Sequence, residues 1–366
     1  MVIRSSRRVG WLRFSVMLCL TGMCLASASA ANWLTPGPVS LKSIGPMTFT
    51  PDGTLLIGDP SAATVYAMQI EKSAGDAAAS DFADLTAAIT KQLSAGSAIS
   101  LGELAVHPES KSTFVTAMVD GKVQLLRISG DNISEVNLDK INHASKQLAS
   151  PPADKEFSRR GRKYNLRNQS ITDLAFFDGK LIVSGLAAGD SPSQVLEMPV
   201  PFAENSIATG VEIFHAAHGR DETATIRTFL PMKIDGQPTL LAGFTCTPLV
   251  RFDLGKLDGS QRVRGTTVAE LGNRNTPLDM VVYEKDGATF ILMSNSARGM
   301  MKISTTGIQD REGLTDRVSG GGTAGQAFET VDALAGIVQM DQLDGGHAVV
   351  LQETDNGLAL KTIELP

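Results

Sequence analysis

The stretch Phe49-Thr50-Pro51-Asp52-Gly53-Thr54-Leu55-Leu56-Ile57 places an Asp-Gly pair between two short apolar runs. Asp-Gly between alternating apolar segments is a strong signal for a tight β-hairpin, because glycine tolerates the positive φ that such turns require. The same arrangement recurs at Asp178, Asp235, Asp286 and Asp344. The stretch therefore predicts one hairpin of a repeated β unit.

Six such units align on these turns, with His107-Pro108-Glu109-Ser110 taking the place of the turn in the second unit. Each unit has an apolar run before the turn, another after it, and a third run with clear alternation, and runs rich in Val, Ile, Leu and Phe are typical of strands. The first runs are residues 46–50, 104–106, 174–177, 229–234, 280–283 and 336–340. The second runs are residues 55–58, 113–119, 181–185, 240–244, 290–294 and 348–352. The third runs are residues 65–70, 123–128, 195–198, 249–254, 300–303 and 360–365.

These repeats predict an all-β fold, a β-propeller of six blades with four antiparallel strands each, in one domain over residues 31–366. Residues 133–138 and 266–271 are candidates for fourth strands. We expect residues 33–41 to supply the outer strand of the last blade, which would close the ring and leave no free sheet edge. A β-sandwich or a solenoid with irregular repeats is the alternative.

The stretch from Phe49 to Ile57 resembles the strand–turn–strand opening of NHL-type and related exported bacterial propellers. The resemblance implies the architecture of the mature chain and is specific to the fold only. That superfamily includes lactonases, lyases and scaffolds, so the resemblance does not fix an activity.

Residues 1–30 are predicted to be a signal peptide. Four arginines and no acidic residue flank an apolar run over residues 14–25, and Ala28-Ser29-Ala30 has the small-x-small pattern of a cleavage site. The run is shorter than the ~20 residues that span a bilayer, although an uncleaved anchor is the alternative. We expect export to the periplasm or the outside. Ser6-Arg7-Arg8 resembles the start of a twin-arginine signal, so both export routes stay open.

Cleavage would leave 29 Lys and Arg against 39 Asp and Glu. This acidity argues against nucleic acid or an anionic membrane surface as the main partner. No later apolar run reaches membrane length, so no membrane span is expected in the mature chain. Cys246 is the one cysteine after residue 30, which excludes an intrachain disulfide in the mature protein. We expect a monomer.

Two stretches depart from the repeat. Residues 73–97 carry apolar side chains at helical spacing and predict a short surface helix. Residues 142–168 are predicted to be a basic insertion between blades, either a solvated loop or a docking site for an acidic partner or an anionic glycan. Its cations are Lys155, Arg159, Arg160, Arg162, Lys163 and Arg167.

In a propeller, the loops that lead into the first strands share one end with the loops between second and third strands, because antiparallel strands alternate in direction. These loops surround the channel mouth, where such folds usually bind ligands. An arginine cluster there would favour a carboxylate, phosphate or sulfated ligand; alternatively, each arginine pairs with a neighbouring acid and fixes the loops. The candidate ligand-binding residues are Arg227, Asn273, Arg274, Asn275, Asn295, Arg298 and Cys246.

His215, His218 and Glu222 belong to the densest patch of chemically capable side chains and are candidate ligands for a divalent metal. Structural or exposed histidines are the alternative. Haem and nucleotide are not expected, because Cys-x-x-Cys-His and Gly-x-x-x-x-Gly-Lys are absent from the sequence. Pyrroloquinoline quinone (PQQ) is not expected either, because the repeated tryptophans of large quinoprotein dehydrogenases are missing.

The sequence therefore favours an exported propeller that binds a small molecule or a protein through the loops around its channel, with an anionic ligand as one option. The alternative is a metal-assisted hydrolase, lactonase or lyase with its site at the channel mouth. The twin-arginine-like start suggests a third hypothesis, an accessory factor for an exported redox enzyme.

Overall fold

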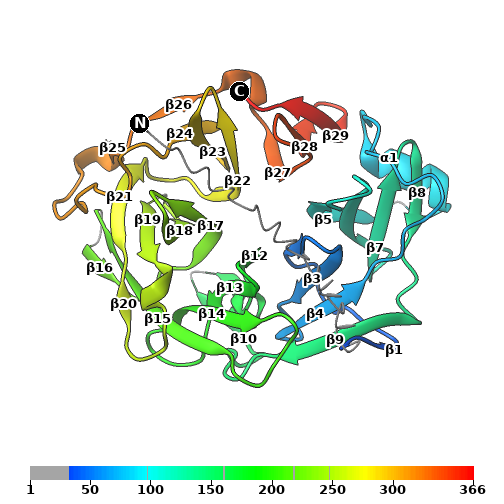
Figure 1. The fold of residues 1–366 in the computed structure, drawn as a ribbon, viewed down its shortest axis with the longest axis horizontal. Coiled ribbons are helices and arrows are strands. Elements are labelled where there is room, and N and C mark those ends of the chain that lie inside the picture. The colour runs from blue at the N-terminus through cyan, green and yellow to red at the C-terminus, as the bar shows by residue number, and fades with distance from the viewer. Residues whose placement is uncertain (1–32, 97, 160, 217–218, 247) are drawn as a thin grey trace, which may run out of the picture. The chain divides into compact units, whose positions relative to one another are not determined.

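A computed structural model describes residues 33–96, 98–159, 161–216, 219–246 and 248–366. The predicted signal peptide, residues 1–30, lies outside the described residues. Within Trp33–Pro366, antiparallel sheets stand in a ring and form a six-bladed β-propeller (Figure 1). Among the described residues, no helix is both long and apolar enough to cross a membrane. The predicted fold class is confirmed.

The six blades are named here by the order in which their innermost strands occur in the chain. Blade I holds β1 (Thr35–Gly37), β2 (Met47–Phe49), β3 (Thr54–Asp59), β4 (Thr64–Gln69) and β9 (Ile141–Gln147). Blade II holds β5 (Ile99–Val106), β6 (Thr113–Val119), β7 (Lys122–Ser129) and β8 (Asn132–Glu135). Blade III holds β12 (Asp173–Phe177), β13 (Lys180–Leu186), β14 (Ser193–Pro199), β15 (Ile207–His215) and β16 (Gly219–Asp221), with β20 (Val263–Arg264) parallel to β15.

The other three blades follow one another along the chain. Blade IV holds β17 (Ile226–Ile234), β18 (Gln237–Phe244), β19 (Pro248–Asp253), β21 (Thr266–Leu271) and β25 (Thr323–Gly325). Blade V holds β22 (Pro277–Lys285), β23 (Ala288–Asn295), β24 (Met301–Ser304) and β26 (Phe328–Thr330). Blade VI holds β27 (Ile337–Gln342), β28 (His347–Thr354) and β29 (Gly357–Glu364). Outside the blades lie the helix α1 (Leu85–Leu93), the hairpin β10 (Glu156–Arg159) and β11 (Arg162–Asn165), and the 3-10 turns η1 (Leu166–Gln169), η2 (Leu254–Lys256), η3 (Ser319–Gly321) and η4 (Asp332–Leu334).

The Asp-Gly turns join the first and second strands of their blades as predicted. Asp178, Asp235 and Asp286 have φ values of 50°, 50° and 52°, and the glycine after each also has a positive φ. Two successive positive φ values define the tight primed turn, whose twist matches that of the strands it joins. The hairpin registers then follow from the turns, with Phe177 opposite Lys180 in blade III.

The fourth strands predicted at residues 133–138 and 266–271 are confirmed, since β8 and β21 complete blades II and IV. The predicted closure of the last blade by residues 33–41 is wrong. β1 pairs instead with β9 at the outside of blade I. Blade VI is extended by Phe82, whose backbone exchanges hydrogen bonds of 2.9 and 3.0 Å with Leu360 of β29.

The blades do not follow the chain order around the ring. The innermost strands are neighbours in the order β2, β12, β17, β22, β27, β5 and back to β2 (Figure 1). Blade II therefore lies between blades I and VI, and the chain returns from it to blade I as β9 before it starts blade III. Apolar clusters of the described residues lie between ring neighbours: Phe114 packs with Leu55 across blades I and II, and Leu126 with Leu351 across blades II and VI.

The predicted surface helix is confirmed as α1. It begins after Asp84, whose side chain accepts a hydrogen bond of 3.0 Å from the backbone N–H of Ala87, as an N-cap residue does. Leu85 and Ile89 are fully buried in the cluster that joins blades II and VI. The helix and the Phe82 segment thus cover the junction at which the ring closes.

The basic insertion over residues 142–168 is only partly the solvated loop that its charge suggested. Its first residues continue β9, which pairs with β4 inside blade I. Its middle forms the β10–β11 hairpin, which belongs to no blade. The alternation of apolar residues is weak over β9, so the sequence alone did not separate this strand from the loop.

Candidate functional site

The innermost strands line the central channel, and five of the six carry a polar side chain just before or inside their apolar run. The charged members of this set act on one another across blades that are not ring neighbours, for example Glu103 in blade II on Asp279 in blade V. Such coupling places them around a shared space rather than in separate blade interfaces. The five are Glu103, Asp173, Arg227, Asp279 and Gln339, called here the channel cluster.

β-bulges set the positions of several members of this cluster. The register of the innermost strand shifts between Leu101 and Leu104, between Ile226 and Thr228, between Pro277 and Asp279, and between Ile337 and Gln339. A bulge adds a residue to one strand and re-aims the neighbouring side chains. The repeated bulge therefore presents polar side chains at one level of the channel.

The carboxyl groups of the cluster hold their protons unusually strongly. Burial, reinforced by the charge of Asp173, raises the pKa of Glu103 to about 8, although Gln339 donates a hydrogen bond to it and Arg227 lies near. Burial raises the pKa of Asp173 to about 7. Burial and then the charge of Glu103 raise the pKa of Asp279 well above its ordinary value. Near neutral pH, the cluster therefore holds carboxylic acids that can donate as well as accept hydrogen bonds.

Asp173 and Asp279 also join neighbouring blades. Asp173 accepts hydrogen bonds from the backbone N–H of Leu174 at 2.7 Å and from that of Phe229 in blade IV at 2.8 Å. Asp279 accepts from Met280 in its own strand at 2.7 Å. These bonds fix both carboxyl groups, so the cluster is held rigidly by the frame of the propeller.

Two atoms of the channel cluster are buried without a hydrogen-bond partner. They are Oε1 of Gln339, an acceptor, and Nε of Arg227, a donor. A buried polar atom without a partner costs about 1–3 kcal/mol, and such atoms call for a functional or structural reason. A ligand that donates a hydrogen bond beside Gln339 would satisfy its oxygen atom.

A cavity of about 610 Å³ opens onto this cluster. Glu103 and Gln339 line it, together with Asn295, the bulge residue Leu278, and Leu351. Its size lies in the range of about 300–1,000 Å³ that is usual for small-molecule sites. Its mixture of apolar walls and a few polar groups is also usual for such sites.

Among the predicted ligand-binding residues, Arg227 belongs to the channel cluster and Asn295 lines its cavity. Asn275 is buried and joins the loops of this face: its side chain donates to Asn295 Oδ1 at 2.8 Å and accepts from Ala297 N at 3.0 Å. The half-buried Cys246 donates its backbone N–H to the carbonyl oxygen of Asn275 at 2.9 Å. Asn275 and the backbone of Cys246 therefore shape the rim of the channel.

The other three candidates lie together at one edge of the rim. Arg298 donates to the carbonyl oxygen of Asn273 at 3.1 Å, and the side chain of Arg274 is exposed. Arg227, by contrast, acts on Glu103 and Asp173 inside the channel. The contacts thus connect Asn273 with Arg298 and place Arg227 in a different environment. Ligand binding by this group stays a prediction.

The described members of the histidine patch contact other charged side chains. His215 is buried, and its Nδ1 lies 3.5 Å from Oε1 of Glu270, a carboxyl group whose pKa burial raises. Glu222 lies 3.9 Å from Arg220 and 3.8 Å from Arg262, while His218 lies outside the described residues. Across the described ranges, no three His, Cys, Asp or Glu side chains are grouped closely enough to hold one metal ion.

Sequence reasoning missed Glu103, Asp173, Asp279 and Gln339. A signal was present: Glu103, Asp173 and Asp279 each directly precede the first apolar run of their unit, and Gln339 lies inside it. A polar residue repeated at the start of a channel-lining strand points into the channel if the strands converge. That convergence was not visible in single runs.

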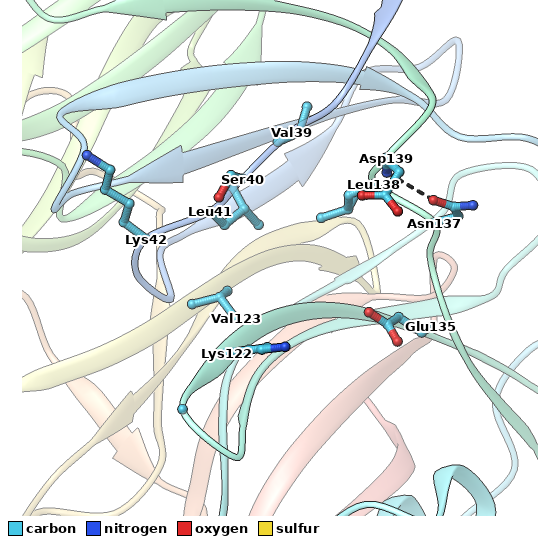
Figure 2. A pocket seen from close by; sticks show the side chains of 11 residues that line it. Val39, Ser40, Leu41, Lys42, Lys122, Val123, Glu135, Asn137, Leu138 and Asp139 are labelled. Atoms are coloured by element: carbon cyan, nitrogen blue, oxygen red, sulfur yellow. Dashed lines mark hydrogen bonds between the residues drawn. The ribbon is translucent and has the colours of Figure 1, made fainter.

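A larger hollow lies between residues of blades I and II (Figure 2). Its volume is about 790 Å³, and Lys122, Glu135 and Asn137 line it with Val39 and Leu138. Its charged side chains are exposed, and the hydrogen bond drawn there joins Asn137 to the backbone of Asp139. No buried polar atom without a partner faces this hollow among the described residues, so the channel is the better candidate.

Comparisons with known proteins give structural neighbours at low identity. No family model matches the sequence, and no curated protein matches it. A putative 6-phosphogluconolactonase from Bacteroides uniformis is 8% identical, with a TM-score of 0.35, over 86% of this chain and 74% of that one. A PQQ-bound aldose sugar dehydrogenase from Streptomyces coelicolor is 11% identical, with a TM-score of 0.32, over 90% and 97%. Domains 1–2 of Drosophila semaphorin 1b are 8% identical, with a TM-score of 0.42, over 91% and 88%.

Proposed function

We propose that this propeller binds a small polar molecule, neutral or cationic, in the channel at the level of Glu103 and Gln339. The observation that carries the proposal is a cavity of about 610 Å³ that is lined by Glu103 and Gln339, two members of the channel cluster whose side chains are joined by a hydrogen bond. The unpartnered Gln339 Oε1 supplies an acceptor for the ligand, since Gln339 lines the cavity. Asn295 adds a polar group at the mouth.

The charge of the channel cluster supports this ligand class over an anionic one. Three carboxyl groups face one guanidinium group, and each carboxyl pKa is raised. The raised pKa values mean that these surroundings disfavour negative charge, so an anion would bind there at a cost. A hydroxyl group can instead pair with the protonated carboxyl groups, and an ammonium group can pair with an ionised one. An anionic ligand therefore fits the Arg274 and Arg298 edge better than the channel.

A thermal-shift screen tests the proposal. The library presents each carbon skeleton as an acid, an alcohol and an amine, at pH 7.5. Alcohols and amines should raise the melting temperature of the wild type, and Gln339→Leu should abolish this effect. The control Glu135→Gln changes the larger hollow between blades I and II and should keep it. Effects that survive Gln339→Leu, or that are strongest for the acids, would contradict the proposal.

The raised carboxyl pKa values also favour a second candidate function, an acid–base hydrolase or lyase acting in the same cavity. A carboxyl group that titrates near neutral pH is well matched to general acid or base catalysis. A sugar-lactone hydrolysis assay should then show activity whose pH profile follows the pKa of Glu103, about 8, and is lost in Glu103→Gln. Activity unchanged by that variant would remove this candidate. Export, a divalent metal and membership of the NHL-type group stay predictions.

A further inference from the structure

The β10–β11 hairpin stands outside every blade and has two different faces. Phe157 lies directly opposite Tyr164, and their rings are stacked at 5.8 Å with an interplanar angle of 24°. Residues that lie opposite in an antiparallel pair share one face, and so do residues two apart in a strand. Arg162 therefore lies on the face of Phe157 and Tyr164. Lys163 lies on the other face, where its Nζ is 3.0 Å from the carboxylate of Glu156.

The aromatic face is exposed. Phe157, Tyr164 and the adjacent Leu166 are 40%, 39% and 38% exposed, which makes them three of the four large apolar side chains exposed in the described residues. Exposed apolar side chains gathered in one place, with charged residues around them, mark interaction sites. A hairpin this short also gains stability when something covers it.

The hairpin is held in place at its base. Arg167 Nε donates to the carbonyl oxygen of Pro152 at 2.7 Å, and the Asn165 side chain donates to Asp154 at 2.7 Å. The chain then runs through η1, where Gln169 accepts from Thr225 Oγ1 at 3.1 Å in the loop that leads into β17. The hairpin therefore rises from the face that carries the channel mouth.

We propose that the aromatic face of this hairpin binds an anionic polysaccharide. Cations make the segment from Lys155 to Arg167 positive in a protein whose net charge is −6, so the partner should be anionic and contact this segment alone. Sugar rings offer flat C–H faces that pack on aromatic rings, and Arg162 would pair with their carboxylate or sulfate groups.

The size of the hairpin distinguishes this partner from others. Strands of four residues give a face of roughly 14 by 10 Å, far below the ~800 Å² that a stable protein partner covers. Nucleic acid carries a charge about every 1.7 Å, and the acidic body of the propeller would repel so dense a polyanion. A chain of acidic sugars is narrower than a protein surface and less densely charged than nucleic acid.

Affinity electrophoresis of the full-length protein in gels containing polygalacturonate or dextran sulfate tests the proposal. The wild type should be retarded, and Phe157→Ser with Tyr164→Ser, or Arg162→Ser alone, should each weaken binding by about tenfold or more. The charge-matched control Lys140→Ser alters an exposed lysine elsewhere and should stay within about twofold. The charge variant should also reduce the salt dependence of binding.

Several outcomes would overturn the proposal. They are no retardation of the wild type, an equal loss in the control, or hairpin variants that bind as the wild type does. Tighter hairpin-dependent binding of a single-stranded oligonucleotide or of polyglutamate would assign the face to nucleic acid or to an acidic protein instead. Melting curves should match the wild type for all variants, because the hairpin contributes to no blade. Glu103→Gln should leave retardation unchanged, which separates this site from the channel.

Discussion

The carboxylate of Asp279 accepts a hydrogen bond of 2.7 Å from the backbone N–H of Met340 and so joins blade V to blade VI. The same device joins blade III to blade IV through Asp173 and Phe229. Asp341 repeats it between blades VI and II, where it accepts from Val106 N at 2.7 Å. Each of these carboxyl groups thus joins two neighbouring blades by a hydrogen bond. Asp173 and Asp279 also belong to the channel cluster.

Asp279→Ala should destabilise the protein by roughly 2–4 kcal/mol, because it leaves the buried N–H groups of Met280 and Met340 without an acceptor. Urea unfolding measures the change. The control Asp344→Ala removes an exposed carboxylate that accepts a hydrogen bond from Gly346, and it should cost less than about 0.5 kcal/mol. Equal losses in the two variants would show that Asp279 does not join the blades.

Glu103→Gln should stabilise the protein at alkaline pH. The folded state raises the pKa of Glu103 to about 8, so the native protein holds a proton that the unfolded chain releases at a lower pH. The contribution of Glu103 to stability therefore falls as pH rises from the ordinary pKa of 4.5 to about 8. The variant should match the wild type near pH 5 and exceed it by about 1 kcal/mol or more near pH 9. Circular-dichroism melting at both pH values measures the difference in stability. If the stability of Glu103→Gln relative to the wild type decreased with rising pH, the prediction would be contradicted.

Gly45→Ala should lower the melting temperature. A Cβ at Gly45 would lie 2.0 Å from the carbonyl oxygen of Gly58 and 2.7 Å from Pro60, so the backbone of blade I must shift. Overpacking of this kind costs about 1–3 kcal/mol. At Gly345 nothing lies within 4 Å of an added Cβ. The melting temperature of Gly345→Ala, measured by differential scanning calorimetry, should therefore stay close to that of the wild type. An equal decrease in melting temperature for Gly345→Ala would refute the packing argument.

His215→Ala should reduce stability rather than metal content. The imidazole is buried beside Glu270, so its removal leaves a cavity next to that carboxyl group, at a cost of about 1–3 kcal/mol. Elemental analysis of wild type and variant, alongside urea unfolding, separates the two roles. A stoichiometric metal that the variant loses would contradict this expectation and support the metal-site hypothesis for His215, His218 and Glu222.

The turns and strands of each blade could be predicted from the sequence because they depend on neighbouring residues. Asp178-Gly179, Asp235-Gly236 and Asp286-Gly287 form the predicted turns because their positive φ depends on these residues alone. The apolar runs gave nearly all first, second and third strands for a similarly local reason, since a strand between two packed blades is apolar over most of its length. The β10–β11 hairpin, which pairs with no blade strand, was accordingly not separated from its basic loop.

The order of the blades and the channel cluster depended on contacts between distant parts of the chain. Blade II lies between blades I and VI because Phe82 pairs with Leu360 and Leu126 packs with Leu351, and no local pattern encodes such pairings. Glu103 meets Gln339 only once that ring has closed. The sequence by itself thus determined the repeated unit, because turns and strand alternation are set by neighbouring residues. The tertiary structure alone decided which polar side chains share the channel, because burial and charge coupling arise only when the blades are assembled.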